Sequence, residues 1–541
     1  MRFPFLFRVD WLSYVLGFVS GILAVGLLAI TRILIPRLRS KINQRVQEAR
    51  QELTKSTDDR LRKDTLRLAQ RMHIASPLFT LDEIIITPRL LAPPPVIVPG
   101  SGLLEEDVPG IPLPYTPDWP ELGANYHAQT LTFPQALSRG SNLALLGNAG
   151  SGKTVALAYL ASMIARQDKS ADELIQKIPI LVHASDFLGF LLKSGSGSKI
   201  DPLETMIEVV SKYASILTLP RLPGVIKMAF ESGSAILLFD GLDELPPEQA
   251  DLVTRYLGTL LEQYSKVLVV AAVSPESCSG LLTLGFVPSA LASWQDQEKA
   301  EFLNKWGDLW GRYIAPGIQQ GPGEIDPILL STWLSQHDPF VTPMEITLKT
   351  WAAFAGDSLG SGLGESIEAY VRRASVGIPD GEYYLEKIAS QMTLTLNPYV
   401  TIKEVEAWLP ELSQLSIEET QEETHTPDSL QDTDQTPVQE IPVPAAVDQL
   451  NVSAENTDPQ AAIPEAASPS PKQPARKVSA AQKVINDLAA SGILAQRSGD
   501  RITFAHPILT GYLAAKTYTN EHDLSCLDSQ PEWSLKKYAL M

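Results

Sequence analysis

The sequence predicts an α/β fold in which helices flank a parallel β-sheet, and three observations lead to it. A short apolar segment, Leu143–Leu146, runs into a glycine-rich stretch and then into an Ala/Leu-rich helical pattern. A second apolar segment, residues 235–239, ends in acidic residues. Two further apolar segments, 178–182 and 267–273, alternate with helical patterns. Strands that alternate with helices form parallel sheets that helices cover on both faces.

The glycine-rich stretch has the spacing G-x-x-x-x-G-K-T of a P-loop. In such a loop backbone N–H groups face inward, and the N-terminus of the next helix adds partial positive charge. The candidate nucleotide-binding residues are Gly147, Asn148, Ala149, Gly150, Ser151, Gly152, Lys153 and Thr154. Lys153 can reach the β- and γ-phosphates, and the Thr154 hydroxyl can bind Mg²⁺. We therefore expect ATP or ADP with Mg²⁺; a glycine-rich turn without a ligand is the alternative.

The acidic end of the apolar segment 235–239 has the Walker B arrangement. An aspartate at the tip of a buried parallel strand can bind the Mg²⁺ that the Thr154 hydroxyl also contacts, so Asp240 is the second candidate metal ligand. A further acid nearby can orient water for attack on the γ-phosphate, and Asp243 and Glu244 are the candidate catalytic residues. The alternative is an acidic surface turn.

Composition narrows the function classes. The chain has 541 residues, enough for about three domains, and a net charge of −19. Its two cysteines, Cys278 and Cys526, match no metal-ligand spacing and indicate a reducing compartment. No basic stripe interleaved with aromatic residues occurs in the sequence, so direct binding of DNA or RNA is not expected.

The P-loop and the stretch Leu237–Glu244 together resemble the NACHT group of the signal-transduction (STAND) NTPases, of the bacterial type. The likeness continues in Thr342–Leu348 and in Phe504–Ala515, in the order that the family has. It implies an NTPase core (133–290), a helical domain (291–375) and a winged-helix domain (376–410 and 478–520). It also implies that Pro343 lies against the adenine and that His506 contacts the β-phosphate of ADP. The alternatives for His506 are a cap of its own helix and a place in the domain core.

The sequence departs from this family at two places. The family usually ends a sensor strand in Thr-Ser-Arg-Pro, but residues 272–275 are Ala-Val-Ser-Pro, so the arginine that would sense the terminal phosphate is missing. Hydrolysis is therefore expected to be slow or lost. A glutamate of the last motif is replaced by Gly511, which changes the polar contacts expected around that motif.

The N-terminal part carries the prediction of a membrane anchor. Residues 11–36 form an apolar run long enough to cross a bilayer, after a short segment 1–10; a cleavable signal peptide is the alternative. The excess of Arg and Lys after the run predicts a single-pass protein of the cell membrane with a cytoplasmic NTPase domain. Gly17 and Gly21 share one helix face that would allow a homo-oligomer, although glycines are also tolerated in membrane helices without such a role.

The remaining segments connect or extend these domains. Residues 37–75 read as a solvated, charged juxtamembrane helix, and residues 76–132 as a proline-rich linker. Residues 411–477 are rich in Asp, Glu, Thr and Pro and contain only two Lys and one Arg, all near their end, which predicts a disordered acidic insertion. The insertion either captures a partner, inhibits by charge, or is a passive loop. Residues 521–541 form a C-terminal tail.

The expected function is a membrane-anchored nucleotide switch in signalling or defence, closed with ADP and open with ATP. A homo-oligomer through the NTPase domain and an unidentified protein partner are further expectations. Two alternatives belong to other classes: a housekeeping ATPase that couples hydrolysis to work at the membrane, and a degenerate nucleotide-binding scaffold.

Overall fold

A five-stranded parallel sheet, in the order β4-β5-β6-β3-β7, is the centre of the fold. The computed structural model describes residues 57–91, 128–192, 201–317, 341–357, 362–411, 479–498, 500–518, 521–531 and 533–540. The strands are β3 (Leu143–Leu146), β4 (Ile178–His183), β5 (Ala235–Asp240), β6 (Leu268–Val273) and β7 (Val287–Ala290). Every residue of β3, β4, β5 and β6 is buried, because helices cover both faces, and this explains the continuous apolar runs. The predicted parallel sheet is confirmed.

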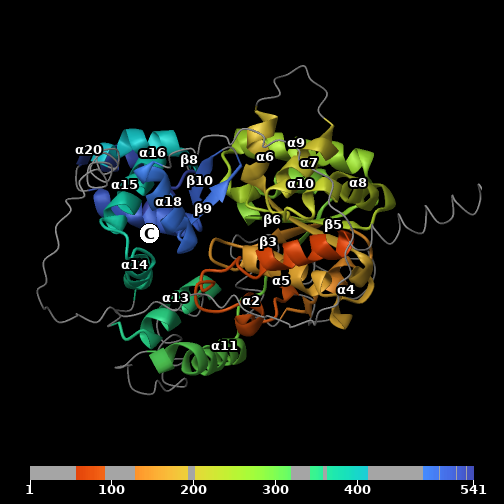
Figure 1. The fold of residues 1–541 in the computed structure, drawn as a ribbon, viewed down its shortest axis with the longest axis horizontal. Coiled ribbons are helices and arrows are strands. Elements are labelled where there is room, and N and C mark those ends of the chain that lie inside the picture. Colours follow the sequence, from red (N-terminus) through yellow and green to blue (C-terminus); the bar gives the residue numbers. More distant parts are fainter. Residues whose placement is uncertain are drawn as a thin grey trace, which may run out of the picture.

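Alternate residues of β5 face the two helical layers. Ile236 and Leu238 belong to the apolar cluster that contains α5 (Lys153–Ala165), whereas Leu237 and Phe239 belong to the cluster on the other face. That second cluster is built from α6 (Ala184–Leu191), α7 (Pro202–Ser211), α8 (Leu222–Ser232) and α9 (Pro247–Gln263). The strand period of two thus distributes one apolar run between both layers. We call this unit, residues 128–291, the core lobe (Figure 1).

Shorter elements complete the core lobe and the segment that precedes it. Two of the strands, β1 (Leu90–Leu91) and β2 (Thr130–Leu131), pair in antiparallel fashion. The short helices are α2 (Leu81–Ile84), α4 (Phe133–Leu137) and α10 (Ser279–Thr283). The short 3₁₀ segments are Lys169–Gln176, Leu219–Arg221, Leu242–Glu244 and Pro275–Ser277.

A helix through residues 57–69 lies on the core lobe. Its Leu61, Arg62 and Thr65 side chains are buried. Arg62 Nη1 donates to the Ile164 carbonyl at 2.9 Å, and Thr65 Oγ1 donates to the Pro179 carbonyl at 3.1 Å. The expected solvated helix therefore differs from what is found over its described part, because Arg62 and Thr65 bond to backbone carbonyls of the core lobe while Leu61 packs into its core. Residues 76–91 of the expected linker likewise contain α2 and β1.

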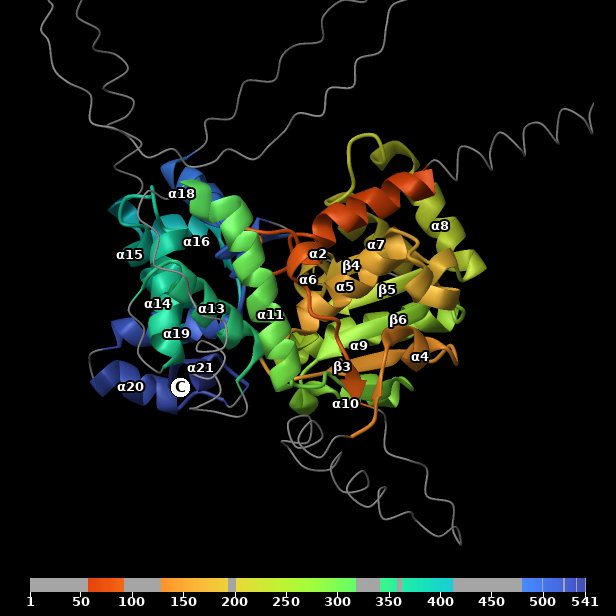
Figure 2. The ribbon, with the colours of Figure 1, turned by 90° about the horizontal axis from the view of Figure 1, so that it is seen from below.

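Two helices connect the core lobe to the C-terminal part. They are α11 (Asp296–Leu309), which continues into the π-helical turn Trp310–Ile314 and the 3₁₀ turn Ala315–Gly317, and α13 (Pro343–Phe354). Trp306 of α11 is fully buried, and its ring lies 5.2 Å from that of Phe79 and 6.3 Å from that of Trp351 of α13. Figure 2 shows α11 running across the front of the molecule where the two parts meet.

The C-terminal lobe, residues 362–540, combines helices with a three-stranded antiparallel sheet of order β8-β10-β9. Its strands are β8 (Val400–Thr401), β9 (Leu494–Arg497) and β10 (Arg501–Phe504). Its helices are α14 (Leu363–Ala374), α15 (Gly381–Leu394), α16 (Ile402–Trp408), α18 (Ala480–Ala490), α19 (Pro507–Thr517), α20 (Glu521–Asp528) and α21 (Lys536–Leu540). Ile502 of β10 pairs with Val400 of β8, so the segments before and after residues 412–478 share one sheet and one apolar core.

The predicted membrane topology requires a correction. Across the part of the chain that the structure describes, no helix combines the length and the apolar character needed to cross a bilayer. A single-pass protein of the cell membrane is therefore not supported. Residues 11–36, with Gly17 and Gly21, lie outside the described residues, as do residues 37–56, 92–127 and 412–478.

Candidate nucleotide-binding site

The loop between β3 and α5 has the backbone shape that phosphate binding needs. Gly150 and Gly152 have φ values of 81° and 93°, in the left-handed region that glycine adopts without strain. Gly152 is the N-cap of α5 and has no side chain to occupy the first N–H groups of the helix. No acidic residue lies in the first turn of α5. The free N–H groups and the helix dipole therefore make the loop an anion site.

Lys153 extends back over this loop. Its Nζ donates to the carbonyls of Gly147 at 2.8 Å and Asn148 at 3.2 Å, and lies 3.2 Å from Asp243 Oδ2. The side chains of Lys153 and Asp243 are 11% and 15% exposed. The amine is thus fixed above the loop, where a phosphate oxygen could replace the contact with Asp243.

The residues at the tip of β5 fit a Mg²⁺ ion. Asp240 is 4% exposed, and burial raises the pKa of its carboxyl group, which accepts a hydrogen bond from the Thr154 side chain. A divalent cation between the Thr154 hydroxyl and the Asp240 carboxylate would compensate the buried negative charge, and both ligands are the hard oxygens that Mg²⁺ prefers. Bound there, the ion would supply positive charge that neutralises phosphate oxygens.

The two candidate catalytic acids have different partners. They follow Gly241, whose φ of 71° turns the chain directly after β5. Asp243 pairs with Lys153, whereas Glu244 Oε2 lies 3.3 Å from His183 Nε2. Burial raises the pKa of Glu244, but the hydrogen bond and the charge of His183 lower it by more, so that the pKa falls to about 2. Glu244 is therefore a carboxylate at neutral pH, and it is bound to a neighbouring side chain.

His183 is a site residue that the sequence analysis missed. It is the last residue of β4 and lies beside Asp240 in the sheet. Its Nδ1 is 2.8 Å from Ser185 Oγ. A methyl group at Gly241 would overlap the His183 ring, with Cδ2 at 2.8 Å, so Gly241 provides room as well as the turn. The signal was available in the sequence, because His183 ends a buried strand at the same sheet edge as Asp240.

His506, although far from the P-loop in sequence, lies against it. As N-cap of α19, its Nδ1 is 3.2 Å from the Ile508 N–H, and its Nε2 is 3.1 Å from the Gly150 N–H. Burial lowers the pKa of His506 to about 4, so the ring is neutral at pH 7 and has only one acceptor nitrogen. If Nδ1 caps the helix, Nε2 carries the proton. Because the Gly150 N–H points at Nε2, two donors then face each other, and a phosphate oxygen that accepts from both would relieve this conflict.

The N-terminus of α13 contacts the same loop. The Met344 N–H donates to the Gly150 carbonyl at 3.1 Å, and the Thr342 hydroxyl caps α13 by accepting from the Glu345 N–H at 3.3 Å. Pro343 stands between these two residues and lines the cavity described next. The loop is thus contacted by α13 on one side and by α19 on another.

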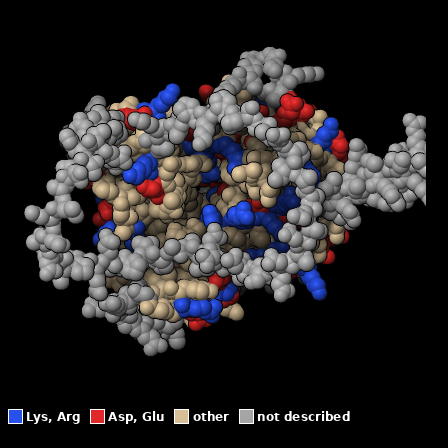
Figure 3. Space-filling model, viewed as in Figure 1, with Lys and Arg blue, Asp and Glu red and all other residues tan. Residues whose placement is uncertain are grey.

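A cavity of about 1000 Å³ brings these residues together. All of the predicted site residues line it except Gly147. Its wall also contains residues that the sequence analysis did not assign to the site, among them His73, Ile86, Met392, Arg497 and Lys537. They come from the N-terminal segment and from the C-terminal lobe, so the cavity lies between the two lobes. Figure 3 shows Lys and Arg side chains gathered on the face between the lobes.

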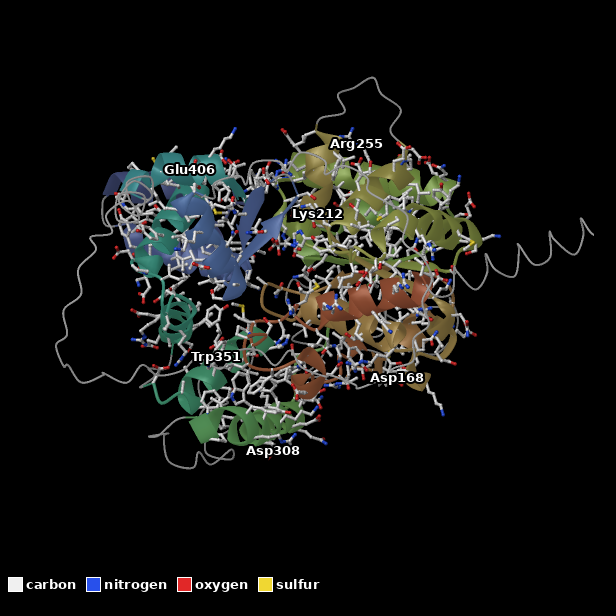
Figure 4. The ribbon with its side chains drawn as sticks, viewed as in Figure 1. Asp168, Lys212, Arg255, Asp308, Trp351 and Glu406 are labelled. Carbon is white, nitrogen blue, oxygen red and sulfur yellow. The ribbon has the colours of Figure 1, made fainter. Side chains whose placement is uncertain are left out.

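A buried carboxylate also joins the lobes beside this cavity. Asp186 of α6 is fully buried and accepts from the Ser498 N–H at 2.7 Å and from the Tyr213 hydroxyl. Lys212 Nζ lies 3.7 Å from it, and Figure 4 shows Lys212 where the core lobe meets the β9–β10 hairpin. Burial raises the pKa of Asp186, but the charge of Arg497 and the hydrogen bonds lower it below its usual range. The carboxylate therefore stays charged and binds the hairpin.

Comparison with known families agrees with this geometry. Residues 141–308 match the family model of the NACHT domain. This match and the five-stranded parallel sheet with flanking helices support a NACHT-type P-loop NTPase core that binds nucleotide. A search of curated proteins finds no match to the chain.

Proposed function

We propose that the protein is a nucleotide-dependent switch, in which bound ADP holds the core lobe and the C-terminal lobe together and exchange for ATP separates them. The observation that carries this proposal is the 3.1 Å approach of His506, on α19 of the C-terminal lobe, to the Gly150 N–H of the P-loop. A nucleotide whose β-phosphate is bound by both groups stabilises only the arrangement in which the lobes touch. Differential binding of this kind is what a population shift requires.

The roles of the other residues follow from their positions. We infer that the loop N–H groups and Lys153 bind the phosphates, that Thr154 and Asp240 hold Mg²⁺, and that Pro343 packs against the adenine. His506 acts as a latch that only the closed arrangement supplies. The C-terminal lobe is inferred to be a winged-helix domain, since its helices α16, α18 and α19 surround the sheet β8-β10-β9. A signalling role is the use that such a switch would serve.

Slow hydrolysis is consistent with this proposal. Each candidate catalytic acid already has a basic partner, Lys153 for Asp243 and His183 for Glu244. A carboxylate oxygen that already contacts a basic side chain is less available to orient a water molecule. The alternative of a continuously working ATPase therefore has less support, and trapped ADP is the expected state.

Mass spectrometry of nucleotide released from freshly purified protein tests the proposal. The expected result is ADP in a ratio near one per chain in the wild type, and none in Lys153→Ala. A wild-type protein that carries no nucleotide and binds neither ATP nor ADP when they are added would refute it. Rapid multiple-turnover hydrolysis would favour the working ATPase instead.

A further inference from the structure

The C-terminal segment after α20 lies in the wall of the candidate nucleotide cavity. Five of its residues line this cavity together with the P-loop and His506, namely Trp533, Ser534, Leu535, Lys537 and Tyr538. The segment is held on the C-terminal lobe, because Lys536 Nζ donates to the Asp528 carbonyl at 3.4 Å and Gln530 Nε2 donates to the Thr393 carbonyl at 2.9 Å. Nothing in the proposed switch yet uses this segment.

Gly511 provides the seat for α21. A methyl group at this position of α19 would overlap the Cβ and the backbone carbonyl carbon of Tyr538, and would lie 2.7 Å from the Tyr538 carbonyl oxygen. Contacts as short as these with backbone atoms cannot be relieved by a side-chain rotation. Gly511, where the sequence departs from the family pattern, thus allows α21 to lie directly on α19.

The seat places α21 at the phosphate end of the cavity. Tyr538 lines the cavity together with Lys153, Asp243 and Glu244. Burial and the charges of the nearby acids raise the pKa of its phenol, which is therefore protonated. On the other side, Lys537 Nζ lies 3.6 Å from Glu276 Oε2, in the turn that follows β6 of the core lobe. Helix α21 thus rests on the C-terminal lobe and pairs with the core lobe.

We propose that α21 is a lid over the phosphate end of the nucleotide cavity, seated on Gly511 and anchored by the Lys537–Glu276 ion pair, and that its opening sets the rate of nucleotide exchange. The proposal rests on nucleotide binding at the P-loop. The anchor is weak, because the side chains of Lys537 and Glu276 are 39% and 81% exposed. A weak anchor allows the lid to open without unfolding of either lobe.

Release of a fluorescent ADP analogue, followed by stopped flow in the full chain, tests the lid. Gly511→Ala should release the analogue about tenfold faster, since the methyl group expels α21. Gly224→Ala is the matched control, because nothing lies within 4 Å of a methyl group at that helical position, and it should release at the wild-type rate. A chain that ends before Lys536 should release as fast as Gly511→Ala, and adding Gly511→Ala to it should change nothing further.

Lys537→Ala keeps the backbone of the lid and should release about threefold faster, whereas Lys537→Arg should behave as the wild type. A release rate in Gly511→Ala within twofold of the wild type would overturn the lid. So would an equal acceleration by Gly511→Ala in the shortened chain, because the effect would then come from α19 alone. If the wild type does not bind the analogue at all, the proposed switch fails, and the lid fails with it for that separate reason.

Discussion

Replacement of His506 separates the two contacts that its ring makes. Nδ1 lies 3.2 Å from the Ile508 N–H as the cap of α19, and Nε2 lies 3.1 Å from the Gly150 N–H of the P-loop. His506→Ala removes both contacts. His506→Asn keeps a good helix cap, since asparagine is among the best N-cap residues, but its shorter side chain cannot reach the loop. The pair of variants therefore distinguishes a latch from a structural cap.

The expected magnitudes differ for the two contacts. A hydrogen bond to a charged group contributes about 1.5 to 3 kcal/mol, so loss of the phosphate contact should weaken ADP by about tenfold to a hundredfold. Loss of the cap should lower the free energy of unfolding by about 1 kcal/mol. His506→Ala should show both effects, and His506→Asn only the first. ATP affinity should change less than ADP affinity, because ATP favours the open state, which lacks the latch.

The assay is calorimetric titration of nucleotide-free protein with ADP and with ATP, combined with denaturant unfolding of each variant. Equal weakening of both nucleotides would show that His506 does not distinguish the two states. An unchanged ADP affinity in His506→Asn, together with a loss of stability in His506→Ala, would identify the residue as a cap only. Either result would refute the latch.

Four further predictions concern the same lobes. Lys153→Ala should weaken ATP and ADP by about a hundredfold at nearly unchanged stability, because the site loses its charged phosphate ligand but little packing; titration and thermal melting check both. Asp240→Asn should reduce the gain in nucleotide affinity that Mg²⁺ gives, and an equal Mg²⁺ dependence in both forms would contradict this role. Asp186→Asn should lower the free energy of unfolding by about 2 kcal/mol, because the amide cannot accept from Ser498 and Tyr213 as the carboxylate does. The stability of the protein should depend on pH through His506. The pKa of its ring is about 4 in the folded state, against a usual value of 6.5, so the unfolded state binds more protons between pH 4 and pH 6.5. The contribution of His506 to the free energy of unfolding should be fully present above pH 6.5 and should decrease as the pH drops toward 4. His506→Asn should remove this dependence from the free energies of unfolding that chemical denaturation gives across this pH range.

The sequence by itself predicted the core lobe well, because its signals are local. A strand that is buried on both faces must be apolar throughout, and a loop that surrounds a phosphate needs glycines at fixed positions. The runs that became β3, β5 and β6 and the glycines at 150 and 152 carry that information within a few residues of chain. The match of residues 141–308 to the NACHT domain supports the same assignment.

Only the tertiary structure decided which distant residues share the cavity. His183 reaches Glu244 because β4 and β5 are neighbours in the sheet, although 61 residues separate the two in the chain. The role of Gly511 depends on Tyr538 lying on it, and that of the 57–69 helix on the carbonyls it meets. Such contacts are set by how whole elements pack, which local periodicity does not encode. The sequence thus predicted a phosphate-binding loop, whereas packing between the lobes decided what surrounds it.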